Sequence, residues 1–507
     1  MIGEIRELTG AIVAALTSEG YRVRQVLPGH TVHQLQADRY EADLSSPQAL
    51  HELHRLLGGP DGGAVGTAIN FLGLSQAFGP PNSEGGEVSV KTTEWTFHLV
   101  KEFAEDLRAS AVESGRFINL TALDGQFGLK SGAVSWVSAG TLGISKTLQR
   151  EYPRLHVKNI DVEAEIPPDL LAAQLLQELA SEDDLLEVGL TREGRWRLVL
   201  KQESAPRNLP PLALDAESVV LITGGAYGVT AEVAKGLAAT AKPRLILVGR
   251  SALPEPETPR TRDLDRVSLR KLLLDDARRT QTPVVPAEIE QRINRILKDR
   301  EIRNNIEACT AAGAMVEYHS LDVRDAQQFG GFIDDLYERF GRIDGVVHGA
   351  GVIEDKRIAD KTTTSFANVF HTKVDSALTL ARRLRPDKLR FLVFFGSVSG
   401  RFGNAGQVDY SAANEVLNKL ADHLASCWDA RVVCINWGPW DAGMVSDELR
   451  RLYASRGIEL IAVPDGVRAC LDELRMPSRN AEVVISRSVE QLIRVGRQSK
   501  SEVPSAW

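Results

Sequence analysis

Apolar runs alternate with amphipathic segments along most of the chain. Residues 218–222 form a β-branched, apolar run that is typical of a buried strand. Residues 231–237 follow with Ala231, Ala234 and Leu237 on one face, which predicts a helix. Similar pairs of strand and helix patterns occur before and after this stretch. Their alternation predicts an α/β fold.

The same patterns run through two halves of the chain. In the first half we expect helices at 5–16, 94–110 and 135–149 and strands at 64–73, 116–120 and 157–161. In the second half we expect strands at 218–222, 244–251, 345–351, 389–395 and 431–436 and one ending at 321–323, with further helices at 326–340, 369–384 and 410–425.

A proline-rich stretch separates the two halves. Residues 206–217 are predicted to be a linker between a structural subdomain, residues 1–205, and a catalytic subdomain, residues 218–507. Within the second, the connection at about 252–308 is too long for an ordinary loop, and much of it is charged and helix-prone. We therefore expect an insertion with its own helices.

The two halves also resemble each other in sequence. Residues 117–128 parallel residues 392–403, and with a gap of one residue the next segments align too. Three pairs of positions then face each other: Ala122 and Ser397, Trp136 and Tyr410, and Gly140 and Asn414. The first copy lacks every hydroxyl and amide of the second copy at these positions. Because proton transfer needs such groups and packing does not, the first copy is predicted to be a scaffold.

Composition and charge narrow the class of protein. A chain of 507 residues suggests about two or three domains. The formal net charge of −8 argues against nonspecific nucleic-acid binding. No apolar run approaches the roughly 20 residues needed to cross a membrane, and the N-terminus has no signal pattern. The cysteines lack metal-ligand spacing. We therefore expect a cytoplasmic protein without a metal site, membrane contact or nucleic-acid partner.

A glycine-rich turn follows the first strand of the second half. Thr223, Gly225 and Gly228 lie between that strand and the next helix, where backbone N–H groups and the positive end of a helix bind a pyrophosphate. The following strand ends in Arg250 and Ser251, where a dinucleotide's adenosine ribose would lie. An arginine there, without an acidic residue, favours NADPH over NADH. The alternative is a doubly wound domain in which the turn is not used.

Four polar residues further along form a candidate catalytic set. Ser397 follows a buried strand, and Tyr410 opens a helix that carries Asn414 one turn later. A free tyrosine has a pKa of about 10, and a nearby ammonium, for which Lys373 is the candidate, would make it a better acid. Hydride delivery to a ketone creates an alkoxide that Ser397 would stabilise and Tyr410 would protonate. Each residue alone fits an ordinary core, cap or surface position, but their joint spacing favours catalysis.

A series of short motifs makes the assignment more specific. They are Thr223-Gly-Gly-Ala-Tyr-Gly228, Val248-Gly-Arg-Ser251, Leu321-Asp-Val323, Val347-His-Gly-Ala-Gly351, Val369-Phe-His-Thr-Lys373, Gly396-Ser397, Phe402-Gly-Asn-Ala-Gly-Gln-Val-Asp-Tyr410, Asn414 and Asn436-Trp-Gly-Pro-Trp440. Together they resemble the ketoreductase domain of type I polyketide synthases, within the short-chain dehydrogenase/reductase superfamily. The first half is similar to the structural subdomain of these enzymes. The resemblance implies two Rossmann-like, doubly wound subdomains, the N-terminal one degenerate and structural.

The resemblance implies a role for each matching residue. Tyr410 would be the proton donor, Ser397 would position the ketone, and Lys373 and Asn414 would complete the proton relay. The residues implied to bind NADPH are Thr223, Gly225, Tyr227, Gly228, Val229, Arg250 and Ser251 around the turn and ribose, Asp322 and Val323 beside the adenine, and Ala350 and Gly351 beneath the cofactor.

Two features depart from the pattern of modular ketoreductases. Tyr227 and Thr230 stand where this turn often has glycine, and the inserted segment at about 252–308 is absent from typical modular domains. Both features look more like the ketoreductases of polyunsaturated-fatty-acid synthases and of some iterative synthases.

The resemblance implies NADPH-dependent reduction of a β-ketoacyl group carried by an acyl carrier protein of a polyketide or fatty-acid megasynthase. The residues at 353–355, together with Phe402, favour a 3R (D) hydroxyl product. Residues 441–456 are predicted to form an amphipathic helix, either a lid over the substrate or plain packing. An inactive scaffold and a free-standing alcohol or sugar dehydrogenase are the alternatives. Candidate contacts for an acidic carrier protein are Arg382, Arg383 and Arg385, or Arg260, Arg262 and Arg266.

Overall fold

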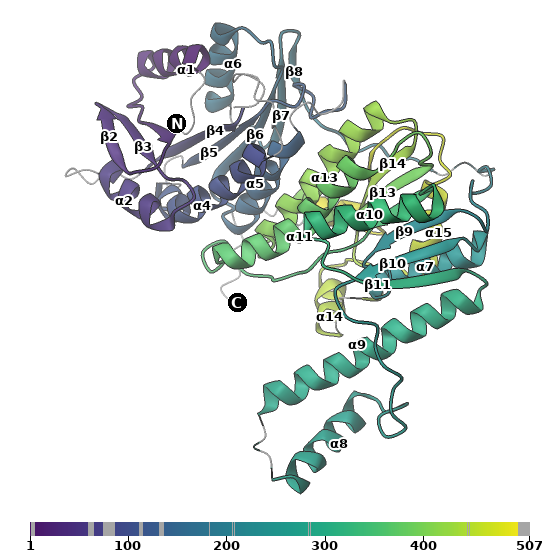
Figure 1. Ribbon diagram of the computed structural model, residues 1–507. Helices are drawn as coiled ribbons and strands as arrows, with labels where there is room; N and C mark the ends of the chain where they lie inside the picture. The colour runs from purple at the N-terminus through teal and green to yellow at the C-terminus, as the bar shows by residue number, and fades with distance from the viewer. Residues whose placement is uncertain are drawn as a thin grey trace.

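The computed structural model describes residues 1, 6–58, 65–74, 87–110, 115–130, 136–181, 183–204, 206, 208–281, 283, 285–443, 445 and 447–494. Each half of the chain contains a largely parallel sheet with helices on both faces, and a pair of helices projects from the second half (Figure 1). The α/β class predicted from the alternating patterns is confirmed.

The sheet of the C-terminal half is parallel throughout, with the order β11-β10-β9-β12-β13-β14-β15. Its strands are β9 (Val219–Thr223), β10 (Arg244–Gly249), β11 (Met315–Ser320), β12 (Gly345–His348), β13 (Phe391–Ser397), β14 (Arg431–Trp437) and β15 (Glu482–Ile485). The strand order reverses between β9 and β12. Doubly wound sheets bind their ligands at such a switch point, at the carboxyl ends of the strands.

Two layers of helices enclose this sheet. Helices α7, α9 and α15 contribute to the core on one face, and α10, α11 and α13 to the core on the other. The helices of this half are α7 (Gly228–Ala241), α8 (Arg266–Arg279), α9 (Pro286–Ala311), α10 (Ala326–Phe340), α11 (Thr363–Arg383), α12 (Val398–Phe402), α13 (Val408–Cys427), α14 (Asp447–Ser455), α15 (Val463–Glu473) and α16 (Val489–Arg494).

Strand β9 shows why the pattern predicts a buried strand. Val219 and Leu221 point into the core formed with α10, α11 and α13, whereas Val220 and Ile222 point into the core formed with α7. All four side chains are buried. A strand covered on both faces needs a continuous apolar run instead of an alternating one.

The main sheet of the N-terminal half has the order β4-β5-β6-β7-β8, in which β4 to β7 are parallel and β8 is antiparallel. Helices α4 and α5 cover one face, and α1 and α6 cover the other. The elements of this half are α1 (Arg6–Ser18), β1 (Gln25–Pro28), β2 (His33–Gln36), β3 (Arg39–Ala42), α2 (Pro47–Gly58), β4 (Thr67–Gly73), α4 (Glu87–Ser110), β5 (Arg116–Thr121), η1 (Trp136–Ala139), α5 (Gly140–Glu151), β6 (His156–Val162), α6 (Pro168–Ala180), β7 (Glu187–Thr191) and β8 (Gly194–Trp196).

The N-terminal sheet matches only the part of the C-terminal sheet that runs from β12 to β15. Its strand order proceeds in one direction, so the described residues of this half form no switch point. Without a reversal of strand order there is no crevice between diverging loops for a nucleotide. This gives a structural reason for the loss of polar groups in the first copy. The sequence patterns did not predict the separate sheet β1-β3-β2, whose strands are four residues long and one of which is exposed throughout.

The two halves meet through α5 and α13, the matching helices of the two copies. A Cβ on Gly143 of α5 would lie 2.4 Å from the carbonyl oxygen of Ser411 of α13, so the two backbones are in direct contact. An apolar core with residues from both halves continues beside this contact, and the rings of Phe97 and Phe366 stack within it at 4.3 Å. The subdomain boundary is therefore a buried surface as well as a linker in sequence.

Helix α9 belongs partly to the predicted insertion and partly to the ordinary fold. Ile302 and Cys309, in its C-terminal part, lie in the core with α7, so this part acts as the crossover helix between β10 and β11. Its N-terminal part extends beyond the sheet and packs on α8 through Ile293 (Figure 1). The projecting arm is therefore shorter than the segment 252–308, because a parallel crossover needs a helix in any case.

Among the described residues, no helix has the length and apolar character to span a membrane. Within the same residues, no cluster of His, Cys, Asp or Glu side chains is arranged to hold a metal ion.

Arg475 donates to the carbonyl oxygens of Leu209, at 3.2 Å, and Pro210, at 2.6 Å, and so ties the stretch between β8 and β9 to the C-terminal half.

Candidate active site

The glycine turn lies at the switch point, next to the loop that follows β12. Gly224 and Gly228 have φ angles of +72° and +61°, which glycine adopts without strain. A Cβ on Gly224 would lie 3.1 Å from the carbonyl carbon of Gly349. The hydroxyl oxygen of Thr223 also accepts a hydrogen bond from the N–H of Ala350 at 3.2 Å. The fold therefore brings together two loops that are far apart in sequence.

The loop after β12 has little space for side chains. A Cβ on Gly351 would lie 3.0 Å from Cε of Lys373, so the loop passes directly over this lysine. A Cβ on Gly349 would lie 2.3 Å from Oγ1 of Thr230. Thr230, one of the two departures from the family's turn, therefore fits because position 349 is glycine.

Ser397 ends β13 and is the N-cap residue of α12. Its Oγ accepts hydrogen bonds from the N–H of Ser399 at 3.2 Å and from the hydroxyl of Ser399 at 3.0 Å. Because both interactions use the oxygen as acceptor, the Ser397 proton is available to a ligand oxygen. The sequence analysis missed Ser399. It could have been found from the sequence, because it is a second serine two positions after Ser397, and serines at this spacing commonly form local hydrogen bonds.

Tyr410 lies in the first turn of α13, in a polar and buried setting. Its N–H donates to Oδ1 of Asp409 at 2.8 Å, and its carbonyl oxygen accepts from Nδ2 of Asn414 at 2.8 Å. Asp409 is held in turn by a buried ion pair with Lys361 at 2.6 Å. Asn414 therefore contacts Tyr410 as the sequence predicts, and the Asp409–Lys361 pair is an addition from the structure.

Lys373 reaches the same place from α11. Its Nζ lies 5.4 Å from the centroid of the Tyr410 ring and donates to the carbonyl oxygen of Phe395 at 2.7 Å. Phe395 is two residues before Ser397 on β13. A Cβ on Gly400 of α12 would lie 2.8 Å from Cβ of Asn414. The end of β13, the middle of α11 and the start of α13 thus gather the predicted set at one edge of the sheet.

The structure corrects one expectation about this set. Burial raises the pKa of Tyr410 to about 12 and lowers the pKa of Lys373 to about 8. The Lys373 ammonium lies against the Tyr410 ring and is bonded to the Phe395 carbonyl. Its attraction therefore does not offset the cost of desolvating a phenolate. Tyr410 is therefore a weaker acid in this structure than free tyrosine, because burial outweighs the attraction of Lys373.

The residues predicted to bind the adenosine end of a cofactor lie beside β10 and β11. Arg250 is exposed, and it contributes with Arg324 to a lowered pKa of Asp322, in which the Arg324 hydrogen bond is the larger cause. Ion pairing joins Asp322 and Arg324 at 2.6 Å. The hydroxyl of Tyr318 donates to the carbonyl oxygen of Ser251 at 2.7 Å. An exposed guanidinium next to a fixed backbone fits a phosphate better than a neutral ribose.

Three other predicted cofactor residues, Val323, Val229 and Tyr227, differ in their surroundings. Val323 is buried in the core of the sheet, so its side chain faces protein. A Cβ on Gly443 would lie 3.5 Å from the backbone nitrogen of Val229. The loop before α14 therefore lies close to the start of α7. Tyr227 is 40% exposed and precedes α7 as its N-cap residue.

Helix α14 coincides with the segment predicted to be an amphipathic lid. None of its residues is buried. Burial raises the pKa of Tyr453 on this helix, with a further contribution from Asp355, and both groups also raise the pKa of Tyr410. Tyr453 and Asp355 therefore lie within electrostatic range of the Tyr410 phenol. The role of α14 as a lid stays a prediction.

The residues at the switch point fit a dinucleotide. The turn provides left-handed glycines, and the N–H of Gly228 already binds an anion, since it donates to Oε1 of Glu301 at 3.0 Å. Gly351 leaves the space above Lys373 free of a side chain. Gly225 and Gly228 would face the pyrophosphate, and Arg250 would face a 2′-phosphate. When bound, a reduced nicotinamide supplies a hydride.

Residues of the N-terminal half hold the segment between Ser397 and Tyr410. Three of them come from α5, which the sequence analysis assigned to a scaffold without naming contacts, and Glu187 of β7 adds an ion pair with Arg401. The bonds are Nζ of Lys146 to the Gly400 carbonyl at 3.2 Å, Nε of Arg150 to the Phe402 carbonyl at 2.9 Å, and the N–H of Gly406 to Oε1 of Glu151 at 2.8 Å. These contacts join residues roughly 250 positions apart, and no local pattern indicates them.

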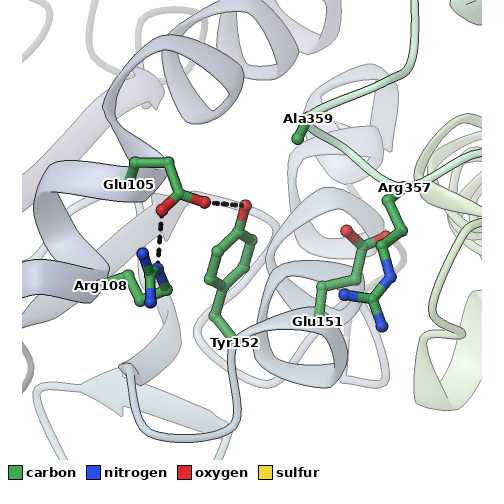
Figure 2. A pocket seen from close by; sticks show the side chains of 6 residues that line it. All are labelled: Glu105, Arg108, Glu151, Tyr152, Arg357 and Ala359. Atoms are coloured by element: carbon green, nitrogen blue, oxygen red, sulfur yellow. Dashed lines mark hydrogen bonds and ion pairs between the residues drawn. The ribbon is translucent and has the colours of Figure 1, made fainter. Parts of the chain in front are cut away.

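A cavity of about 290 Å³ lies where the two halves meet. Figure 2 shows that Glu105 accepts hydrogen bonds from Tyr152, at 3.2 Å, and from Arg108, at 2.7 Å. None of the predicted site residues lines this cavity. Since these polar groups bond to one another, we assign no ligand to it.

The fold and the polar set resemble those of Rossmann-like reductases of the short-chain dehydrogenase/reductase type, a class that binds a nicotinamide cofactor. Comparison with known proteins makes the class more specific. Residues 218–442 match the family model described as "KR domain". The match covers less than half of the chain, and for this stretch it confirms the resemblance seen in the sequence motifs.

Relatives of the chain are multidomain synthases. It is 27% identical over 422 residues to a polyunsaturated fatty acid synthase polypeptide of Thraustochytrium sp., a match that covers 79% of this chain and 15% of the relative. It is also 27% identical over 367 residues to polyketide synthase PksN of Bacillus subtilis, covering 70% of this chain and 6% of the relative. The chain thus spans a small part of the length of either relative.

Solved structures agree with this assignment of the fold. An N-terminal ketoreductase from the macrolactin assembly line superposes with a TM-score of 0.72 at 19% identity, covering 97% of this chain and 87% of that one. The ketoreductase from the first module of phoslactomycin biosynthesis in Streptomyces sp. HK803 gives a TM-score of 0.58 at 25% identity, covering 76% of this chain and 79% of that one. The expected Rossmann-like architecture is confirmed.

Proposed function

We propose that the chain is the ketoreductase of a polyketide or fatty-acid megasynthase located in the cytoplasm. In this proposal it uses NADPH to reduce a β-ketoacyl group on an acyl carrier protein to the β-hydroxyacyl group. The observation that carries the proposal is the gathering of Lys373, Ser397, Tyr410 and Asn414 beside a glycine turn, within a KR domain. The proposed subdomains are residues 1–205 and 218–507.

Each group of the set has a defined task in this reaction. The Ser397 hydroxyl, whose oxygen already accepts two hydrogen bonds, donates a hydrogen bond to the ketone oxygen and so holds the substrate in place. As negative charge develops on that oxygen, Tyr410 transfers its phenolic proton to it. Lys373 stabilises the phenolate that remains, and Asn414 fixes the first turn of α13. Bound NADPH would supply the hydride.

The structure supports an active enzyme over an inactive scaffold, because the polar groups that the first copy lacks are present in the second, where Asn414 bonds to Tyr410 and Lys373 lies over the Tyr410 ring. The proposal is tested by mixing the chain with NADPH and a panel of β-ketoacyl thioesters, followed by chiral analysis of the products. Loss of nicotinamide absorbance with formation of a 3R hydroxyacyl product is expected. A chain that binds no NADPH would be a scaffold, and one that reduces only small alcohol-type ketones would be a free-standing type of dehydrogenase.

The arginines proposed to contact an acidic carrier protein are partly neutralised by neighbouring carboxylates. In the arm, Arg260 pairs with Asp276, and Arg266 pairs with Glu290 at 3.0 Å. On α11, Arg383 pairs with Asp334 at 2.8 Å. These pairs reduce the net positive charge of both clusters. We therefore propose that acidic groups of the carrier protein replace the intramolecular partners of these arginines. Added salt should weaken this binding.

The reduction rate is expected to fall as the pH rises through about 8. Burial lowers the pKa of Lys373 to about 8, so the ammonium is charged below this pH and neutral above it. Only the charged form stabilises a phenolate on Tyr410. The measurement is kcat/KM between about pH 6 and pH 10, which reports groups of the enzyme before substrate binds. Lys373→Met should lower the rate and remove this step from the profile. A wild-type profile that stays level through pH 8 would contradict the assignment.

Replacement of Arg250 by alanine is expected to weaken NADPH binding roughly tenfold to a hundredfold, because a charge-assisted hydrogen bond to the 2′-phosphate is lost. NADH lacks this phosphate, so its affinity should change little and serves as the internal control. The measurement is a fluorescence titration of each nucleotide with wild type and R250A. Equal weakening of NADPH and NADH would show that Arg250 does not contact the 2′-phosphate.

A further inference from the structure

Helix α9, whose N-terminal part forms the inserted arm, contacts the nucleotide turn with its C-terminal part. One face of α9 contacts three consecutive residues of the turn. The contacts are Nδ2 of Asn305 to the carbonyl oxygen of Ala226 at 3.1 Å, Nζ of Lys298 over the ring of Tyr227 at 5.8 Å from its centroid, and Oε1 of Glu301 to the N–H of Gly228 at 3.0 Å. The spacing of these three α9 residues keeps them on one helix face.

The Glu301 contact occupies a position that matters for the cofactor. Gly228 begins α7, and the first N–H groups of a helix have no partner within it. They lie at the positive end of the helix dipole, which attracts anions. In doubly wound sheets the pyrophosphate of a dinucleotide binds here. A carboxylate has the charge and the acceptor oxygens of a phosphate, but two anions cannot accept from one N–H at the same time.

The neighbours of Glu301 allow its side chain to move while the helix stays in place. Asn305 is 6% exposed and bonded to the turn, and Ile302 packs in the core, so both hold this part of α9 against α7. Glu301 itself is only half-buried. Lys298 lies one turn earlier on the same face, and a carboxylate that leaves Gly228 can pair with it.

We propose that Glu301 competes with the pyrophosphate of the dinucleotide for the Gly228 N–H and thereby sets the affinity of the chain for its cofactor. This inference rests on the proposed function. It gives the crossover part of α9, which carries Glu301 next to the core residue Ile302, a role at the cofactor site.

The test compares wild type, Glu301→Gln and Glu307→Gln. The glutamine keeps the size of the side chain and removes its charge. Glu307 is the matched control on the same helix, since it is 69% exposed and lies 3.6 Å from Arg303. Two ligands are titrated: NADPH, by nicotinamide fluorescence, and adenosine 2′-monophosphate, by calorimetry. The second ligand has the 2′-phosphate but no pyrophosphate.

E301Q is expected to bind NADPH roughly tenfold more tightly than wild type. In this variant the pyrophosphate no longer has to displace a carboxylate from the N–H of Gly228. E307Q should bind NADPH as wild type does, and adenosine 2′-monophosphate should bind equally to all three proteins. Unchanged or weaker NADPH binding by E301Q would overturn the inference while the proposed function stands. Tighter binding of both ligands would also overturn it, because that result indicates a general charge effect. If no variant binds NADPH, the proposed function fails and the inference fails with it.

Discussion

Replacing Tyr410 by phenylalanine is expected to lower kcat for reduction of a β-ketoacyl thioester by roughly 10²- to 10⁴-fold, the usual contribution of a positioned general acid. The ring would remain packed beside Lys373, whose Nζ lies 5.4 Å from its centroid. Only the oxygen that carries the proton would be lost. Because the substitution leaves the glycine turn untouched, the Kd of NADPH should stay close to that of wild type. Single-turnover rates with saturating NADPH measure the effect on chemistry directly.

The matched control is Tyr453→Phe. Tyr453 lies on α14 near the same phenol and also has a pKa raised by burial, so its hydroxyl is chemically similar. If Tyr410 alone donates the proton, Y453F should retain kcat within a few-fold. Near wild-type reduction by Y410F would remove the assigned mechanism, and an equal loss in both variants would indicate a disturbed pocket instead of a missing acid.

Replacing Lys146 by methionine is expected to lower the free energy of unfolding by about 3–5 kcal/mol, the usual cost of removing one partner from a buried ion pair. The Lys146 ammonium lies at the junction of the two halves. It contacts Oε1 of Glu187 at 3.0 Å and Oε1 of Glu415 at 2.9 Å, and it donates to the Gly400 carbonyl at 3.2 Å. Glu415 is fully buried, so without Lys146 its charge is poorly compensated. Denaturant unfolding measures the change.

The same variant should also lose activity, because Glu415 follows Asn414 on α13 and Gly400 lies between Ser397 and Tyr410. Lys158→Met is the matched control. Lys158 is equally buried and pairs with Glu178 at 2.7 Å and with Asp183 at 3.1 Å, within the N-terminal half. K158M should be destabilised in the same way, whereas its kcat under conditions where the protein is folded should stay near wild type. If K146M keeps full kcat when folded, α5 does not position the catalytic segment.

The parts of this protein that could be predicted from sequence are those encoded in short segments. The continuous apolar run of β9 indicates burial on both faces, and both faces of the strand are indeed packed. The glycine turn and the Tyr410–Asn414 spacing on one helix are equally local. The structure places the turn at the switch point and shows that Asn414 bonds to Tyr410. Periodicity and turn chemistry act over a few residues, so they can be read without knowing the fold.

Other predictions were incomplete because they concern contacts made only in three dimensions. The arm was expected to begin and end with the segment 252–308, yet the fold uses the end of α9 as the crossover helix. Lys373 was expected to acidify Tyr410. In the structure burial outweighs this attraction, and the Phe395 carbonyl accepts a hydrogen bond from the ammonium. Desolvation depends on everything that surrounds a group, and no spacing in the sequence reports it.

The sequence by itself determined that this chain alternates strands and helices, carries a nucleotide-type turn near one end of its second half, and has the residues of a candidate proton-transfer set in only one of two copies. Tertiary structure alone decided which distant groups meet. It brings α5 of the first copy against the catalytic segment, and it places the carboxylate of Glu301 on the N–H of Gly228. The physical reason is that such contacts join positions tens to hundreds of residues apart, and their energies come from burial and charge pairing that arise only once the sheets have packed.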